Sequence, residues 1–127
     1  MIDGLFASTN YQGVKKMLDA TTLRHEAIAS NLANIETPHY RRIDLNPNFA
    51  SDLSQAIRSE SRSAVETLRP TAGVDFKATA QNEDGNTVQL ESELLHLQDN
   101  TLAHQMQTQL ITGALQKLRY AISTRGI

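Results

Sequence analysis

The chain has 127 residues, a net charge of −2 and no cysteine. Its length is that of one domain. A charge so close to neutral argues against a general nucleic-acid or membrane-surface binder, and the lack of cysteine excludes disulfides, zinc-thiolate sites and thiol catalysis. Aromatic residues make up only 5% of the chain, which is a thin supply of large core side chains. No apolar run reaches the roughly 18 residues of a membrane-spanning helix.

The N-terminal region predicts a long helix over residues 10–34. The residues before it lack the basic and apolar segments of a cleaved signal peptide. Thr9 with Gln12 matches a capping box, and Asn10 is a second N-cap candidate. Spacings that alternate between three and four residues predict a packing seam along this helix, with a polar centre. Its members are Tyr11, Val14, Leu18, Thr21, His25, Ile28, Leu32 and Ile35.

The helix must end near Thr37-Pro38, because the proline ring clashes with the preceding turn and disfavours α geometry at the residue before it. The middle of the chain, residues 38–86, holds all three prolines and is predicted to be irregular. We expect one short helix over 48–57 and brief extended stretches over 65–68 and 74–76. The basic doublet 41–42 is expected to be solvated.

The C-terminal region predicts a second long helix over residues 87–123. The turn signal at 83–86 precedes it, and Asn86 or Thr87 is its predicted N-cap. A seam with spacings of four and three runs along the whole helix. Its members are Leu90, Leu94, Leu97, Thr101, His104, Thr108, Ile111, Leu115, Leu118 and Ile122.

These elements predict a mainly α fold, in which long N- and C-terminal helices form a coiled-coil-like pair. The irregular middle segment holds one short helix and short extended stretches. We divide the chain into 1–37, 38–86 and 87–127, together one domain. Two helices that bury one stripe each offer little apolar area against the entropy cost of ordering the chain. The sequence therefore predicts a protein that completes its core with other chains.

Histidine–glutamate pairs raise a metal hypothesis that their spacing does not support. The pair at 25–26 starts like the zinc motif His-Glu-x-x-His, but Ala29 stands where the second histidine belongs. Glu93 and His96 match half of a ferritin-like di-iron set, and Pro38 interrupts the other Glu-x-x-His spacing. The histidines on the seams fit a packed interface. We expect no metal and no cofactor, and with no nucleophile or phosphate-binding motif we expect no enzyme.

The stretch "ASNLANIETPHYRR" resembles the Ala-x-Asn-Leu-Ala-Asn-x-x-Thr-Pro-Gly-Tyr signature of bacterial flagellar axial proteins, which form the rod, hook and hook-associated parts. Within that family, this stretch and "EDGNTVQLESELLHLQDNTLAHQ" are similar to proteins of the proximal basal-body rod. The matching positions of the first motif are Asn31, Leu32, Asn34, Thr37, Pro38 and Tyr40. The stretch that leads into the C-terminal helix consists of Asp84, Gly85, Asn86, Thr87 and Val88. This stretch favours the proximal rod protein over its nearest sibling in the family.

The resemblance implies a structural subunit that self-assembles into the axle of the flagellum, which transmits torque and encloses the export channel. Such subunits pack their terminal helices in nested layers and leave the cytoplasm unfolded, without a cleaved signal, through the flagellar type III export apparatus. The implied location is the rod in the periplasmic space. The implied partners are other copies, other rod proteins and the ring or export-gate adaptor proteins at the rod base. Nucleic acid and direct membrane insertion are not implied.

The resemblance also gives the asparagine-rich stretch a role as the joint where the N-terminal helix leaves the inner layer. Asn31 and Asn34 are expected to bond backbone groups freed at the helix end; the alternative is that these amides face solvent. His39 stands where the family has glycine, and it bears a cost if that position needs a positive φ. His104 stands where a family tyrosine is common.

Expected packing positions on the two seams are Val14, Leu18, Ile28, Leu94, Leu97, Ile111, Leu115, Leu118 and Ile122. Two alternatives to the proximal-rod hypothesis remain at this point. One is another rod protein of the same family. The other is a cytoplasmic helical adaptor or export chaperone, which would fold and dimerise by itself in dilute solution.

Overall fold

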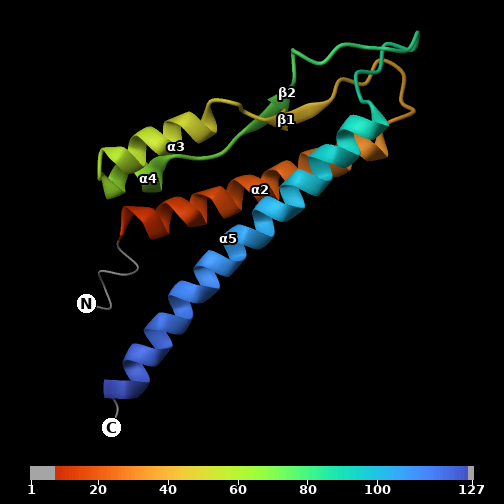
Figure 1. The fold of residues 1–127 in the computed structure, drawn as a ribbon. Helices are drawn as coiled ribbons and strands as arrows, with labels where there is room; N and C mark the ends of the chain where they lie inside the picture. Colours follow the sequence, from red (N-terminus) through yellow and green to blue (C-terminus); the bar gives the residue numbers. More distant parts are fainter. Residues whose placement is uncertain (1–7, 126–127) are drawn as a thin grey trace.

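The computed structural model describes residues 8–125 and is mainly helical, with a long helix at each end (Figure 1). This confirms the predicted fold class. α2 and α5 run antiparallel, and the shorter elements lie between them in the chain. The elements are α2 (Thr9–Ala33), β1 (Ile43–Leu45), α3 (Phe49–Arg58), α4 (Arg62–Thr67), β2 (Ala72–Val74) and α5 (Leu90–Arg125).

The start of α2 differs slightly from the prediction. Ser8, not Thr9 or Asn10, is the N-cap: its backbone is extended and its Oγ accepts a hydrogen bond from Tyr11 N at 3.1 Å. This is the usual way in which a serine side chain satisfies one of the unpaired N–H groups of a first helical turn. The predicted capping box lies one residue too far along the chain.

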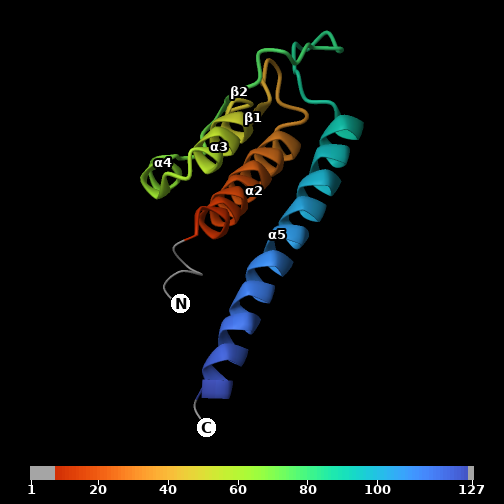
Figure 2. The same ribbon diagram turned by 60° about the vertical axis from the view of Figure 1, so that its left-hand side comes forward.

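The apolar core lies between α2 and the middle segment, not between the two long helices. Helices α3 and α4 cover one side of α2, and α5 lies on another side (Figures 1 and 2). Gly13 of α2 allows this close approach, since a Cβ there would stand 2.6 Å from Ile57 Cδ1 of α3. The buried cluster consists of Ala20, Phe49, Leu53 and Val65, with Leu45, Ala56, Ile57 and Leu68 packed against it.

The middle segment is more ordered than the sequence indicated. The predicted helix over 48–57 is confirmed as α3, but the predicted extended stretch over 65–68 is wrong. Most of it belongs to α4, which Ser61 caps by accepting a hydrogen bond from Ala64 N at 3.2 Å. Val65 is fully buried against α2 and α3, so tertiary packing outweighs the β preference of a valine.

A two-stranded antiparallel ribbon connects the core to the far end of the molecule. β1 pairs with β2 in the register Ile43↔Val74 and Leu45↔Ala72. The extended stretch predicted over 74–76 therefore lies two residues earlier, and β1 was not predicted at all. Three-residue strands carry too little periodicity to be read from a sequence.

The contact between α2 and α5 is polar. The most buried residues of α5 are Glu93, Asn100 and Gln107, which are seven residues apart and are at most 6% exposed. The predicted seam on α5 is rotated relative to this contact. Its members Leu97, His104 and Ile111 lie at the edge of the contact, and the stripe that faces α2 directly is the polar one. On α5, Leu97, Ile111 and Leu118 are half-buried, and Leu94, Leu115 and Ile122 are exposed; on α2, Ile28 is buried and Val14 and Leu18 are half-buried.

α5 is much longer than its partner. Its 36 residues span about 54 Å, whereas the 25 residues of α2 span about 37 Å. In both ribbon views the C-terminal half of α5 stands clear of the other elements (Figures 1 and 2). Among residues 8–125, no other helix or strand therefore lies along this half of α5.

We expect Leu53→Ala to lower the free energy of unfolding by about 2–5 kcal/mol, because it opens a cavity in the core between α2 and α3. Urea unfolding followed by far-ultraviolet circular dichroism measures this change. Leu102→Ala is the matched control, since Leu102 is 58% exposed on α5 and its loss should change stability by less than about 0.5 kcal/mol. Equal effects of the two substitutions would contradict the placement of the core.

Candidate functional site

The end of α2 is closed by its own side chains and by a second segment of the chain. Asn34 is the C-cap: its backbone N–H and its Nδ2 both donate to Ser30 O, at 3.1 and 2.8 Å. Thr37 Oγ1 donates to Asn34 Oδ1 at 3.1 Å. Pro38 follows on the surface and prevents the helix from continuing. The Asn34 side chain thus adds a second hydrogen bond to a carbonyl that the last backbone bond of α2 already satisfies, rather than to a carbonyl left free at the helix end.

Asn86 reaches the same helix end from 50 residues further along the chain. Its Nδ2 lies 2.9 Å from Asn34 O, 3.1 Å from Ile35 O and 2.8 Å from Thr37 O, and its Oδ1 accepts from Val88 N at 2.8 Å. The side chain is 3% exposed. The sequence predicted Asn86 or Thr87 as the N-cap of the second long helix, which is wrong: α5 begins at Leu90, and Asn86 serves the C-terminal end of α2 instead.

Asn31 joins three segments at a position with no solvent exposure. Its Oδ1 accepts from Ile43 N at 2.9 Å and its Nδ2 donates to Ile43 O at 2.8 Å, as a strand neighbour would. Nδ2 also donates to Glu93 Oε1 at 2.8 Å, and Tyr40 Oη donates to Oδ1 at 3.3 Å. One side chain therefore holds α2, β1 and α5 in fixed relative positions.

Arg42 forms a buried ion pair with Glu93, so the prediction that it is solvated is wrong. Its Nε and Nη2 donate to the two oxygens of Glu93 at 3.1 Å each, and its Nη1 donates to Asp75 at 2.6 Å and to Asp44 at 3.2 Å. Arg42 is 6% exposed and Glu93 is fully buried. The two parallel bonds to one carboxylate are the geometry in which guanidinium binds most strongly. Arg41, the other half of the doublet, is exposed over the ring of Phe76.

The cluster of Arg42, Asp44, Asp75 and Glu93 keeps Arg42 and Asp75 in their charged forms. Burial by itself would lower the pKa of Arg42, but the hydrogen bonds to Glu93 and Asp75 outweigh it and raise the pKa above the ordinary value. Burial would likewise raise the pKa of Asp75, but the Arg42 guanidinium holds it below its usual range. The arginine is shared by β1, β2 and α5 through its partners, so the cluster ties the ribbon to the long helix.

The segments on either side of the joint run next to each other in a strained conformation. His39 N donates to Asp84 O at 2.8 Å, Thr87 N donates to Tyr40 O at 3.0 Å, and Thr87 Oγ1 accepts from Arg42 N at 2.8 Å. His39 has a φ of 62°, the left-handed conformation in which a glycine bears no cost. Gly85 has a φ of 75°, and a Cβ there would stand 2.8 Å from His39 Nδ1.

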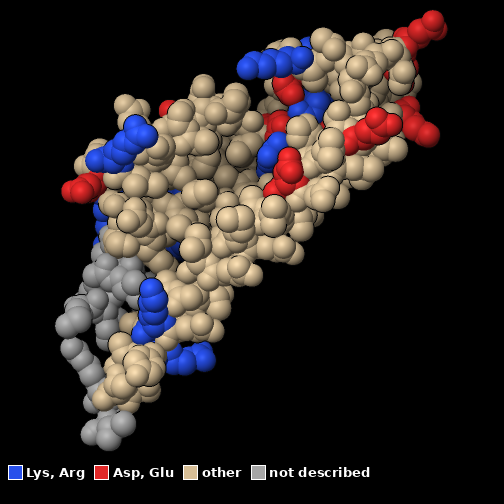
Figure 3. Space-filling view, viewed as in Figure 1, with Lys and Arg blue, Asp and Glu red and all other residues tan. Residues whose placement is uncertain are grey.

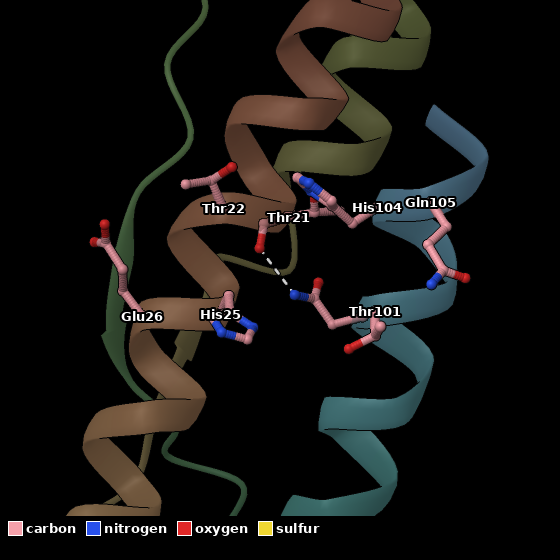
Figure 4. A pocket seen from close by; sticks show the side chains of 8 residues that line it. Thr21, Thr22, His25, Glu26, Thr101, His104 and Gln105 are labelled. Atoms are coloured by element: carbon pink, nitrogen blue, oxygen red, sulfur yellow. Dashed lines mark hydrogen bonds between the residues drawn. The ribbon is translucent and has the colours of Figure 1, made fainter. Parts of the chain in front are cut away.

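A polar cavity of about 450 Å³ opens between α2 and α5, halfway along their contact (Figure 4). Asn100 Nδ2 donates to Thr21 O at 2.8 Å, and Thr21 Oγ1 lies 3.0 Å from Gln107 Oε1 and 3.2 Å from His104 Nδ1. His25 lines the cavity and is exposed. Over residues 8–125, no group of three metal-ligating side chains comes together. The hydrogen bonds that Thr21 makes across the contact hold α2 and α5 in register.

The structure brings together most of the predicted joint residues but assigns them different partners. Leu32 and Tyr40 are half-buried, Thr37 is exposed and Val88 is buried. Sequence reasoning missed Arg42, Glu93 and Asn86 as members of the joint. One signal in the sequence could have identified Glu93: Asn86, Glu93, Asn100 and Gln107 are polar residues that follow one another at intervals of seven. No helix of the described residues is long and apolar enough to cross a membrane.

A helical hairpin with a polar inner contact, a closed joint and an unpartnered leucine face defines a structural assembly subunit. The chain is 30% identical to the flagellar basal body rod protein FlgB of Escherichia coli, over 91% of this chain and 93% of that protein. It is 32% identical to FlgB of Aquifex aeolicus, over 87% and 90% of the two chains, and 30% identical to FlgB of Salmonella typhimurium, over 84% and 86%. No family model matches. The chain belongs to the FlgB family of flagellar basal body rod proteins.

We expect Asn86→Ala to lower the free energy of unfolding by about 1–3 kcal/mol, because it removes the Nδ2 donor that three partly buried carbonyl oxygens share and leaves Ile35 O with no donor among the described residues. Asn86→Asp should cost more, since it puts carboxylate oxygens against the three carbonyls. Urea unfolding of the two variants measures the difference. Asn82→Ala is the control, because Asn82 is exposed. An Asp variant as stable as wild type would contradict the donor role of Asn86.

A double-mutant cycle tests the ion pair. We expect Arg42→Met and Glu93→Leu each to destabilise the fold by about 3–5 kcal/mol, because each leaves a buried charge without its partner. The double variant should be less destabilised than the sum of the two, and the difference is the coupling energy. Strictly additive losses in urea unfolding would show that the two side chains do not depend on each other.

Proposed function

We propose that this chain is a subunit of the proximal rod, which packs the outer face of α5 against neighbouring chains to build the axle of the flagellum. In this role it transmits torque and contributes to the wall of the export channel, without catalysis. The unit that packs is the whole chain, with segments 1–37, 38–86 and 87–127 acting as one axial rod domain. The single observation that carries the proposal is the distribution of apolar side chains on α5.

α5 presents polar side chains to its own chain and exposes large apolar side chains over much of the rest of its surface. The large apolar residues of its exposed surface have between 45% and 72% of their area accessible. So many exposed apolar side chains on one helix mark an interaction surface. Residues 100–116 include no Asp, Glu, Lys or Arg, and the middle of α5 is free of charge on the face seen in Figure 3. The exposed residues are Leu90, Leu94, Leu95, Leu102, Met106, Leu110, Leu115, Tyr120 and Ile122.

Besides packing against its neighbours, a subunit of an axle must resist rotation of one helix relative to the other, and the joint provides this resistance. A torque applied to α5 reaches α2 only through their contact and the joint, so both must resist rotation. Asn31, Arg42 and Asn86 oppose such movement, because each is buried: Asn31 and Arg42 each bond two other segments, and Asn86 bonds the end of α2. Hydrogen bonds to fixed partners are directional, whereas a purely apolar contact would let the helices slide.

Membership of the FlgB family supports a proposal on the partners and the location. We propose that the chain contacts other copies of itself, other rod proteins and the ring or export-gate adaptor proteins at the rod base. We further propose that it reaches the periplasmic space through the flagellar type III export apparatus without a cleaved signal peptide. The small intrachain core supports a protein that is loosely held before assembly and completes its packing in the rod.

The alternatives differ in testable ways. The FlgB relatives favour the proximal-rod hypothesis over another rod protein such as FlgC. A cytoplasmic helical adaptor or export chaperone would stay in the cell and bury the α5 face in a small oligomer. Fractionation of cells that make a tagged chain separates the two, because only a rod subunit is recovered with purified basal bodies.

We expect Leu115→Asp combined with Leu118→Asp to abolish rods and swimming in a strain that lacks its own copy, because unpaired charges would be buried between chains. Electron microscopy of basal bodies and a motility assay measure the result. Leu115→Met combined with Leu118→Met is the matched control, since it changes the same two positions without adding a charge. Motile cells with intact basal bodies in the double variant would refute the proposed packing face.

A further inference from the structure

β2 is an edge strand whose outer side has no partner among the described residues. All three of its residues are exposed, and it pairs only with β1. The hydrogen bond from Asp75 N to Arg42 O, at 3.0 Å, marks a position where the chain faces β1. In an antiparallel ladder such positions alternate, so Gly73 also faces β1. Ala72 and Val74 therefore turn their N–H and C=O groups outward.

This outer edge is short, but no lysine, proline or bulge lies within it. Natural edge strands often carry one of these to prevent pairing, whereas β2 reads Ala-Gly-Val. A groove of about 510 Å³ lies along the ribbon, lined by residues 44–47 and 71–77. Two apolar side chains on it are exposed, Val74 at 38% and Phe76 at 77%. Open backbone groups next to an apolar groove are the combination to which extended peptides bind.

The chain also contains a segment that matches this edge. Residues 78–82 belong to no helix or strand and lie in the long connection between β2 and α5 (Figure 1). Within the described chain, none of the backbone N–H groups of residues 79–82 donates a hydrogen bond. Arg69 and Lys77 flank the β2 edge, and Glu83 follows the segment. None of these three side chains forms a salt bridge within residues 8–125. Glu83 of one copy can therefore pair with Arg69 or with Lys77 of a neighbour, depending on whether the added strand runs parallel or antiparallel to β2.

We propose that residues 78–82 of one copy add as a third strand to the outer edge of β2 in a neighbouring copy. This inference rests on the proposed function, because only in an assembly of identical chains does the 78–82 segment of each copy have the β2 edge of a neighbour available to it. Main-chain hydrogen bonds supply the attachment, and the apolar groove accepts the side chains that point into it. The contact is separate from the helix packing of α5 and fixes the spacing of the ribbons.

Disulfide cross-linking tests the contact directly, because the natural chain has no cysteine. Gly73→Cys is sterically open, since nothing lies within 4 Å of a Cβ built there, and Ala80→Cys is the middle of the added strand. Two differently tagged chains, each with one cysteine, are produced together, and their basal bodies are purified and oxidised. We expect a disulfide-linked pair that contains both tags. Ser63→Cys with Ala80→Cys is the control and should give none.

The outcomes separate this inference from the proposed function. Basal bodies that contain both chains but no linked pair would overturn the strand addition alone. A chain with both cysteines that closes only on itself would also overturn it, in favour of a hairpin within one copy. If the unmodified tagged chain is absent from basal bodies, both the inference and the proposed function fail.

A proline variant provides a second test with a functional readout. Val74→Pro removes an outward N–H group and leaves the bonds between β1 and β2 in place. We expect an unchanged urea midpoint for the isolated chain but at least a tenfold loss in the yield of basal bodies with rods. Val74→Thr keeps the N–H group and should assemble normally. A normal yield with Val74→Pro would overturn the inference.

Discussion

The buried pair of Arg42 and Glu93 is the interaction on which the rest of the structure depends. Two charges taken out of water are stable only if every donor and acceptor around them is satisfied, and here Asn31, Asp44 and Asp75 complete the set. Because the partners of the pair come from different segments, only one arrangement satisfies all of them. That arrangement brings together the end of α2, the β1–β2 ribbon and the start of α5. A slip of α5 along α2 would separate the charges, so the pair determines the register of the hairpin.

The division of α5 into two faces follows from the same constraint. Glu93, Asn100 and Gln107 take the side that faces α2, and the leucines are left for the other side. A polar contact of this kind contributes specificity more than stability, because hydrogen bonds in proteins largely replace bonds to water. The apolar area that would stabilise a pair of long helices is instead available to other chains, as the proposed packing in the rod requires.

The joint shows how a departure from the family pattern is accommodated. His39 adopts a φ of 62° where the family has glycine, at a cost in backbone strain. Its N–H bonds to Asp84, and its ring lies against Gly85, where a larger residue would collide with it. Because Gly85 on the opposite segment has no Cβ, the two segments pass each other closely despite the histidine ring. Asn86, the next residue, then closes the end of α2.

The sequence by itself determined the long helices, the site where the first one ends and the family. Heptad spacing, a proline and the Asn-Leu-Ala-Asn motif are local or periodic signals, which survive without knowledge of the fold. It did not determine which side of α5 faces inward, because a leucine stripe has the same period whether it packs within the chain or between chains. Nor did it reveal that Arg42 is buried or that Asn86 serves a helix 50 residues away. Those roles depend on partners distant in the sequence, and only the tertiary structure, by bringing the partners within hydrogen-bonding distance, decided them.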